Sequence, residues 1–150
     1  MIDNATQSSS SKKDNNIITE ELLLSMDDSE YMNEEQIKFF RHKLEVMRSE
    51  LLENVNQTAE NLRDTPVVPD LVDRATIEEE YALELRTRNR ESKLLSKIET
   101  ALERINDGTY GWCEETGEPI GIRRLLARPT TALSIEAQRR REIRQKLYND

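Results

Sequence analysis

Apolar residues recur at intervals of three and four along two long stretches of the chain. In the first stretch they are Ile37, Phe40, Leu44, Met47 and Leu51, and in the second Leu94, Ile98, Ala101 and Ile105. This heptad spacing is typical of helices that pack along one seam. The segment Thr65-Pro66-Val67-Val68-Pro69 separates the two stretches, and Gly108 follows the second. The pattern therefore predicts two long helices joined by a short turn, as an antiparallel hairpin.

Polar residues at the ends of the apolar stretches indicate where helices begin. Asn33 precedes Glu34-Glu35-Gln36, which suits an N-cap followed by acidic and amide side chains in the first turn. Upstream, Thr19 precedes the apolar island Leu22-Leu23-Leu24, and we expect one or two helical turns that dock on something larger. Residues 1–16 are polar and rich in Ser and Asn, which favours a disordered tail.

The residue composition of the chain changes after Gly108. Three Gly and one Pro within Thr109–Ile122 predict two short strands with tight turns. After Pro129, a final helix is expected from about Leu133 to Leu147. Its inward positions would be Ile135, Ile143 and Leu147, and its outer face would carry a run of basic residues.

The predicted fold class is mostly α: a long antiparallel two-helix coiled coil plus a small zinc-finger-like globular head and a C-terminal helix. The expected organisation follows the chain in order. It comprises a tail (1–16), a segment packing on the head (17–32), the coiled coil (33–108, tip near 64–76), the head (109–132) and the C-terminal helix (133–150).

Composition and charge narrow the functional classes. The net charge is −8 and the pI about 4.9, so the chain is a poor counterion for phosphate backbones and direct DNA binding is not expected. One cysteine excludes an internal disulfide and fits a reducing cytoplasm. There is neither a signal-peptide pattern nor an apolar run of membrane-spanning length. No nucleophile–base pairing, His cluster or Gly-rich phosphate loop indicates an enzyme.

Two segments have the spacing of Cys-x-x-Cys zinc knuckles without most of the ligands. The ligand positions are occupied by Cys113, Thr116, Ser134 and Ala137. Structural zinc requires four Cys or His ligands in a tetrahedral arrangement. The pattern therefore predicts a zinc-finger-like framework with no metal, in which Cys113 is a vestige. A redox-reactive thiol and a ligand of an intermolecular metal are the alternative interpretations of Cys113.

Several motifs together resemble the DksA/TraR family of bacterial transcription regulators, in its DksA-type form. They are Glu30-Tyr-Met-Asn33, Asp70-Leu-Val-Asp73-Arg-Ala75, Glu78-Glu-Glu-Tyr-Ala-Leu-Glu-Leu-Arg86 and Gly121-Ile-Arg-Arg-Leu-Leu-Ala-Arg-Pro-Thr130. The resemblance covers roughly residues 30 to 146. It implies a coiled coil that enters the secondary channel of RNA polymerase with its tip toward the active site.

The resemblance also implies a function and a co-effector. Such a regulator modulates open-complex stability together with the alarmone ppGpp in the stringent response. It represses ribosomal RNA promoters and activates some amino-acid promoters. A monomeric cytoplasmic protein is expected, with polymerase and ppGpp as partners and neither DNA nor membrane contact.

The family's functional positions carry over to particular residues of this sequence. The tip positions facing the polymerase active site are Asp70, Asp73 and Ala75, and the rim contact is Arg90. Capping of the second helix is the alternative role for the two aspartates, because acidic groups are favoured at helix N-termini. The ppGpp-binding positions are Leu94, Lys97 and Arg128. A fourth position, Lys in the family, is Gln138 here, so synergy with ppGpp is expected to be weaker.

Two other functions remain open at this point. One is a Gre-like factor that enters the same channel and stimulates transcript cleavage through its tip acids. The other is a structural coiled-coil adaptor with no role at the polymerase.

Overall fold

The computed structural model describes residues 17–63 and 71–149. Three predicted features lie outside the described residues: the tail 1–16, the turn at 65–69 and Asp70 at the tip. The chain divides into two compact units, one formed by Met1–Leu44 with Ala101–Asp150 and the other by Glu45–Thr100. Each unit is described by itself.

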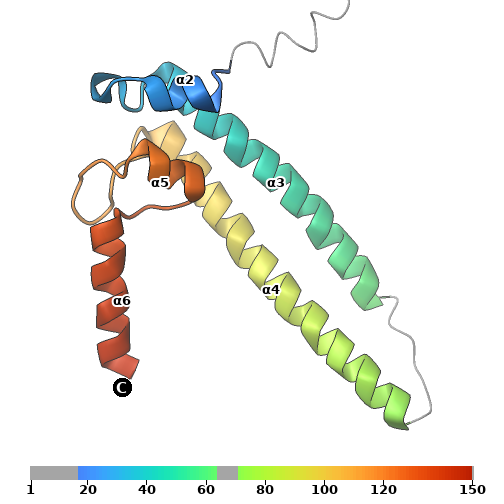
Figure 1. Ribbon diagram of the computed structural model, residues 1–150. Coiled ribbons are helices and arrows are strands. Elements are labelled where there is room, and N and C mark those ends of the chain that lie inside the picture. Colours follow the sequence, from blue (N-terminus) through green and yellow to red (C-terminus); the bar gives the residue numbers. More distant parts are fainter. Residues whose placement is uncertain (1–16, 64–70, 150) are drawn as a thin grey trace, which may run out of the picture. The chain divides into compact units, whose positions relative to one another are not determined.

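Two long helices run through both units: α3 spans Glu34–Arg63 and α4 spans Leu71–Asp107 (Figure 1). In the first unit, the Arg41 guanidinium on α3 donates a hydrogen bond to the Asn106 side chain near the end of α4, at 3.1 Å. In the second unit, the Thr58 hydroxyl donates to the Glu91 carboxylate at 3.3 Å. Both contacts join a residue of α3 to a residue of α4 in antiparallel order, and the predicted mostly helical fold class is confirmed.

The seam between α3 and α4 follows the predicted heptads in most positions. Its buried members are Phe40, Leu44, Leu51, Ile98, Ala101 and Ile105. Leu94 differs, because 38% of its surface is exposed. Thr58 is buried and also donates to the carbonyl of Asn54, so one layer of the seam is polar. Apolar contact therefore dominates the seam near the head, and hydrogen bonding enters it towards the tip.

The N-terminal segment forms α2 (Glu20–Ser25) and a 3₁₀ turn, η1 (Asp28–Glu30). The Thr19 hydroxyl caps α2 by accepting from the backbone N–H of Leu22 at 3.2 Å, as the sequence predicts. At the start of α3, the Asn33 side chain accepts from the backbone N–H of Gln36, and the Gln36 side chain accepts from the backbone N–H of Met32. This reciprocal cap satisfies donors that a helix start leaves unpaired.

The head contains α5 (Ile122–Ala127), followed by α6 (Ile135–Asn149). The expected pair of short strands is wrong: within the described head there is only an isolated bridge between Trp112 and Pro119. Four glycines with positive φ bend this segment too often for a ladder to extend.

The prediction that α6 carries its apolar residues inward is also wrong. Ile135, Ile143 and Leu147 are 58%, 54% and 75% exposed. Only Ala137 is buried on this helix. The contacts of α6 with the head lie at its start, and one ion pair further along joins Arg141 to Glu115. The second half of α6 is therefore uncovered in the described part of the first unit. None of the described helices is both long and apolar enough to cross a membrane.

Candidate functional site

One guanidinium group holds the head to the end of α4. The Arg104 side chain donates to the backbone carbonyls of Thr109 and Trp112, at 3.1 and 2.6 Å. Gly108, with φ at +79°, reverses the chain between them. Arg104 thus ties the last helical turn to the loop that precedes Cys113. Sequence reasoning missed this role, since its only signal is an arginine four residues before a helix-ending glycine.

Tyr31 joins the N-terminal segment to the head from a distance in sequence. Its hydroxyl donates to the carbonyl of Gly111 and accepts from the backbone N–H of Gly121 at 3.0 Å. Its ring also meets Trp112 edge to face, with the ring centroids 5.2 Å apart. Burial raises the pKa of Tyr31, against the smaller effect of its backbone hydrogen bonds, which keeps the hydroxyl a proton donor.

Tyr110 anchors the head from within. It is buried, and its hydroxyl donates to the carbonyl of Pro129 at 2.7 Å. Desolvation raises the pKa of Tyr110 well above its ordinary value, so this donor stays protonated. Its ring packs against Phe40 with the ring centroids 5.7 Å apart. Tyr110 therefore supports the head through both an apolar ring contact and a specific hydrogen bond.

The four degenerate zinc-ligand positions carry one thiol, two hydroxyls and one methyl group. Cys113 is only 3% exposed, and Ala137 is fully buried. Burial alone would raise the pKa of the Cys113 thiol. Hydrogen bonds from the backbone N–H groups and hydroxyls of Ser134 and Thr116 outweigh burial and lower that pKa to about 6. The chain thus surrounds Cys113 with donors where a zinc finger has ligands.

Neighbouring hydrogen bonds complete this arrangement. The Ser134 hydroxyl also accepts from the backbone N–H of Ala137, at 3.2 Å, which caps α6. The Cys113 backbone donates to the Glu118 carbonyl and accepts from the Gly117 N–H, at 2.8 and 2.9 Å. Since hydroxyl and methyl groups replace three of the four ligands, these positions do not fit tetrahedral zinc. No cluster of three or more His, Cys, Asp or Glu residues suited to a metal occurs in residues 17–63 and 71–149.

The sequence-derived polymerase and ppGpp positions fall in different parts of the chain. Asp73 lies in the first turn of α4, and both Asp73 and Ala75 are exposed. Arg90, Leu94 and Lys97 are exposed further along α4. Their spacing of four and three places them on one face of the helix.

Arg128 lies in the first unit, whereas the α4 positions lie in the second. It is exposed and ends α5, its backbone N–H donating to the Arg124 carbonyl at 2.8 Å. The Gln138 side chain is engaged, because its amide donates to the Glu142 carboxylate at 3.0 Å. Gln138 is therefore both uncharged and already partnered.

Comparison with known proteins decides the family. The model for the N-terminal domain of DnaK suppressor protein DksA matches residues 36–105, and the model for the prokaryotic dksA/traR C4-type zinc finger matches residues 108–142. A protein of Caulobacter vibrioides named RNA polymerase-binding transcription factor DksA is 49% identical over 125 residues, 83% of this chain and 88% of its own. The chain belongs to the DksA family.

Further relatives agree with this assignment. The Escherichia coli K12 protein of the same name is 49% identical over 118 residues, 78% of each chain. The solved structure of transcription factor DksA2 from Pseudomonas aeruginosa matches with a TM-score of 0.77 and 48% identity. That match covers 85% of this chain and 99% of the other. The zinc-finger model thus matches a member of the DksA family that retains only one of four cysteines in this region.

Proposed function

We propose that this DksA-family chain is a transcription regulator that binds bacterial RNA polymerase in its secondary channel and works in the cytoplasm. The observation that carries the proposal is the 49% identity, over most of the chain, to proteins named RNA polymerase-binding transcription factors. The helices α3 and α4, of 30 and 37 residues, are long helical elements of the kind that a channel can admit. The protein regulates the polymerase rather than catalysing a reaction of its own.

The tip of the coiled coil acts on the polymerase active site. Asp73 and Ala75 are exposed on the first turns of α4, so neither side chain is committed to the seam of the coiled coil. Asp70, outside the described residues, is assigned to the same surface from the family pattern. The exposed carboxylate of Asp73 supplies negative charge, and the small methyl side chain of Ala75 lets the tip approach the polymerase closely. This action shortens the lifetime of promoter open complexes, repressing ribosomal RNA promoters and activating some amino-acid promoters.

The alarmone ppGpp strengthens this action through Leu94, Lys97 and Arg128. Lysine and arginine suit a ligand that carries two diphosphates, because charge-assisted hydrogen bonds to phosphate are strong. Gln138 contributes no charge, and its amide is engaged by Glu142. The response to ppGpp is therefore weaker than in a member with lysine at this position.

The head of the protein folds without zinc. Supporting this proposal, Thr116 and Ser134 direct donors at Cys113, and Arg104 and Tyr110 fasten the surrounding loop. Since structural zinc sites of this type supply folding energy, a zinc-free head needs such replacements. We expect circular dichroism and the melting temperature to be unchanged by a strong chelator. Loss of helical signal on chelation would contradict this proposal.

The decisive test is transcription in vitro from a ribosomal RNA promoter with purified bacterial polymerase in chelator-treated buffer. The wild-type protein should inhibit, and Asp73→Asn should lose inhibition while still binding the polymerase. Glu99→Gln is a matched control, because it removes one exposed carboxylate from α4 away from the tip. Equal inhibition by the wild type and Asp73→Asn would overturn the assigned role of the tip.

The ppGpp assignment has its own test. Titration of ppGpp in the same assay should show a lower half-maximal concentration for Gln138→Lys than for the wild type, since a cation is restored. Lys97→Gln should raise that concentration, with Lys93→Gln as the control on the same helix. Stimulated RNA cleavage in backtracked complexes, dependent on Asp73, would instead indicate the Gre-like function.

A further inference from the structure

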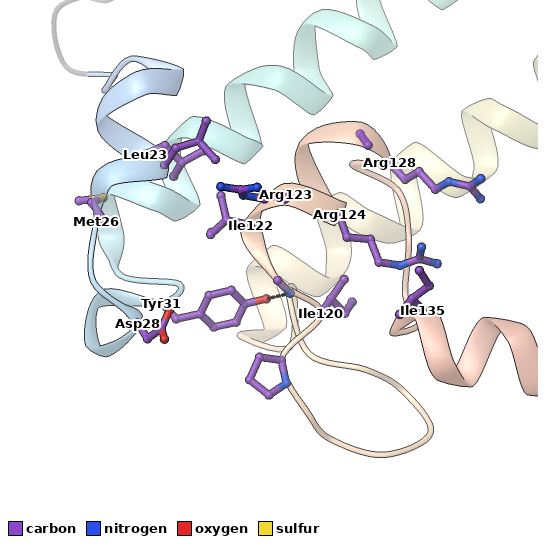
Figure 2. A pocket seen from close by; sticks show the side chains of 14 residues that line it. Leu23, Met26, Asp28, Tyr31, Ile120, Ile122, Arg123, Arg124, Arg128 and Ile135 are labelled. Atoms are coloured by element: carbon purple, nitrogen blue, oxygen red, sulfur yellow. Dashed lines mark hydrogen bonds between the residues drawn. The ribbon is translucent and has the colours of Figure 1, made fainter.

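A pocket of about 860 Å³ lies between the N-terminal segment and the head, within the first unit (Figure 2). Residues of α2 and of the stretch from Met26 to Tyr31 form one side. Residues of α5, the loop before it and the start of α6 form the other. We call this cavity the α2–α5 pocket. Its volume falls in the range of about 300–1,000 Å³ that is typical of small-molecule sites.

Most of the walls of the α2–α5 pocket are apolar. Leu23, which is buried, lies among the lining residues with Ile120 and Ile122. Leu24 and Ile135 also line it, although they are 46% and 58% exposed. Large apolar side chains that stay exposed around one concavity mark a surface that gains from being covered. The occupant must therefore present apolar surface.

The remaining walls carry an excess of positive charge. Arg123, Arg124 and Arg128 line the pocket, whereas Asp28 is its one acidic lining residue. In the part of the chain that the structure describes, the one ion pair joins Arg141 to Glu115, so none of the three arginines pairs with a carboxylate. In Figure 2 the guanidinium of Arg123 points from α5 toward α2, whereas the side chains of Arg124 and Arg128 point away from α2.

The hydrogen bonding of the Arg124 guanidinium is a second observation that favours an anionic ligand. Its Nε donates to the carbonyl of Leu133 at 3.0 Å, which fixes the side chain at the pocket wall. Its Nη2 is buried and has no hydrogen-bond partner among the described residues. A buried unpaired donor is costly, and a nearby anion reduces that cost.

We infer that the α2–α5 pocket binds a small amphipathic anion, a carboxylate carried on an unbranched aliphatic chain. A neutral apolar molecule would cover the walls but leave the buried Nη2 of Arg124 without a hydrogen-bond acceptor. An inorganic anion would pair with the arginines but leave Leu24 and Ile135 exposed. Arginine pairs well with a carboxylate in a bidentate geometry. This inference concerns the isolated chain and does not rest on its role at the polymerase.

Isothermal titration of the full chain with decanoate, below its micelle concentration, tests the inference. Saturable binding at one site is expected. Hexanoate should bind more weakly by about fourfold for each methylene removed, because each methylene loses its burial. Decanol should bind about tenfold more weakly than decanoate, since it cannot pair with arginine. Inorganic phosphate should show no saturable binding.

Matched variants locate the site. Leu24→Gln should weaken decanoate binding, whereas Leu22→Gln should not, because Leu22 is equally exposed on α2 but does not line the pocket. Arg123→Gln should weaken decanoate binding about tenfold and leave decanol binding unchanged. Arg139→Gln is the control for charge on an exposed arginine outside the pocket. Circular dichroism verifies that each variant is folded.

Three results would overturn the inference. The first is the absence of saturable decanoate binding. The second is binding that neither Leu24→Gln nor Arg123→Gln weakens. The third is cosedimentation with phosphatidylglycerol vesicles without affinity for soluble decanoate, which would indicate a membrane surface as the partner in place of a small ligand.

Discussion

The buried thiol of Cys113 should make the stability of the head depend on pH. Cys113 is 3% exposed, and hydrogen bonds from Ser134 and Thr116 lower its pKa to about 6 in spite of burial. In the unfolded chain the thiol has its ordinary pKa, about 8.5. Between these values the folded head holds a thiolate while the unfolded chain holds a protonated thiol. The unfolded state thus binds more protons, so the free energy of unfolding rises with pH.

The magnitude follows from the interval between the two pKa values. Each pH unit between them is worth about 1.4 kcal/mol, so the contribution accumulates to about 3 kcal/mol. It is fully present above the unfolded pKa and is lost as the pH falls through about 6. In Cys113→Ser the side chain does not ionise in this range, and the dependence should disappear.

Urea unfolding followed by fluorescence provides the assay. The chain has a single tryptophan, Trp112, next to Cys113 in the head, so its emission reports the relevant transition. The free energy of unfolding would be compared at pH 6 and pH 9 for the wild type and Cys113→Ser. Ultraviolet absorbance of the thiolate in the folded wild type gives the pKa directly, even if the variant fails to fold. A flat pH profile, or a slope that Cys113→Ser retains, would refute the reasoning.

Three further substitutions test the packing. Gly111→Ala should destabilise the head by about 1–3 kcal/mol, because φ is +91° and the new methyl would lie 2.6 Å from the Met32 sulfur. Urea unfolding measures this loss of stability, and unchanged stability would contradict the packing described here. Tyr31→Phe loses two backbone partners and should lower stability by about 1–3 kcal/mol, with faster proteolysis between α2 and α3 as the readout. Thr58→Val leaves the Glu91 carboxylate without its hydroxyl donor and should lower the thermal midpoint seen by circular dichroism; a raised midpoint would indicate that apolar gain outweighs the hydrogen bond.

Local signals predicted much of the helical architecture. Thr19 and Asn33 begin helices where expected, because a capping side chain acts on donors two or three residues away. The heptad positions Phe40, Leu44 and Leu51 are buried because the helical period alone places them on one face. These features need no knowledge of distant residues.

Features that depend on distant partners were not predictable in the same way. Ile143 and Leu147 have helical spacing, yet spacing alone does not specify a partner surface, and both are exposed. The α2–α5 pocket arises because α2 contacts a helix about a hundred residues later in the chain. The hydrogen bonds from Ser134 to Cys113 depend on the fold of the head, which brings the two residues together. The polymerase and ppGpp positions are assigned from the family pattern and await the transcription assays.

The contacts of Tyr31 have a consequence for how the chain matures on the ribosome. Its hydroxyl bonds to residues 80 and 90 positions later in the sequence. At a synthesis rate of about 5–20 residues per second, these partners emerge roughly 5–20 s after Tyr31 itself. During that interval the N-terminal segment has no head on which to dock. The apolar side chains of α2 are then exposed in the nascent protein, so a delay in translation would leave them open to chaperones or proteases.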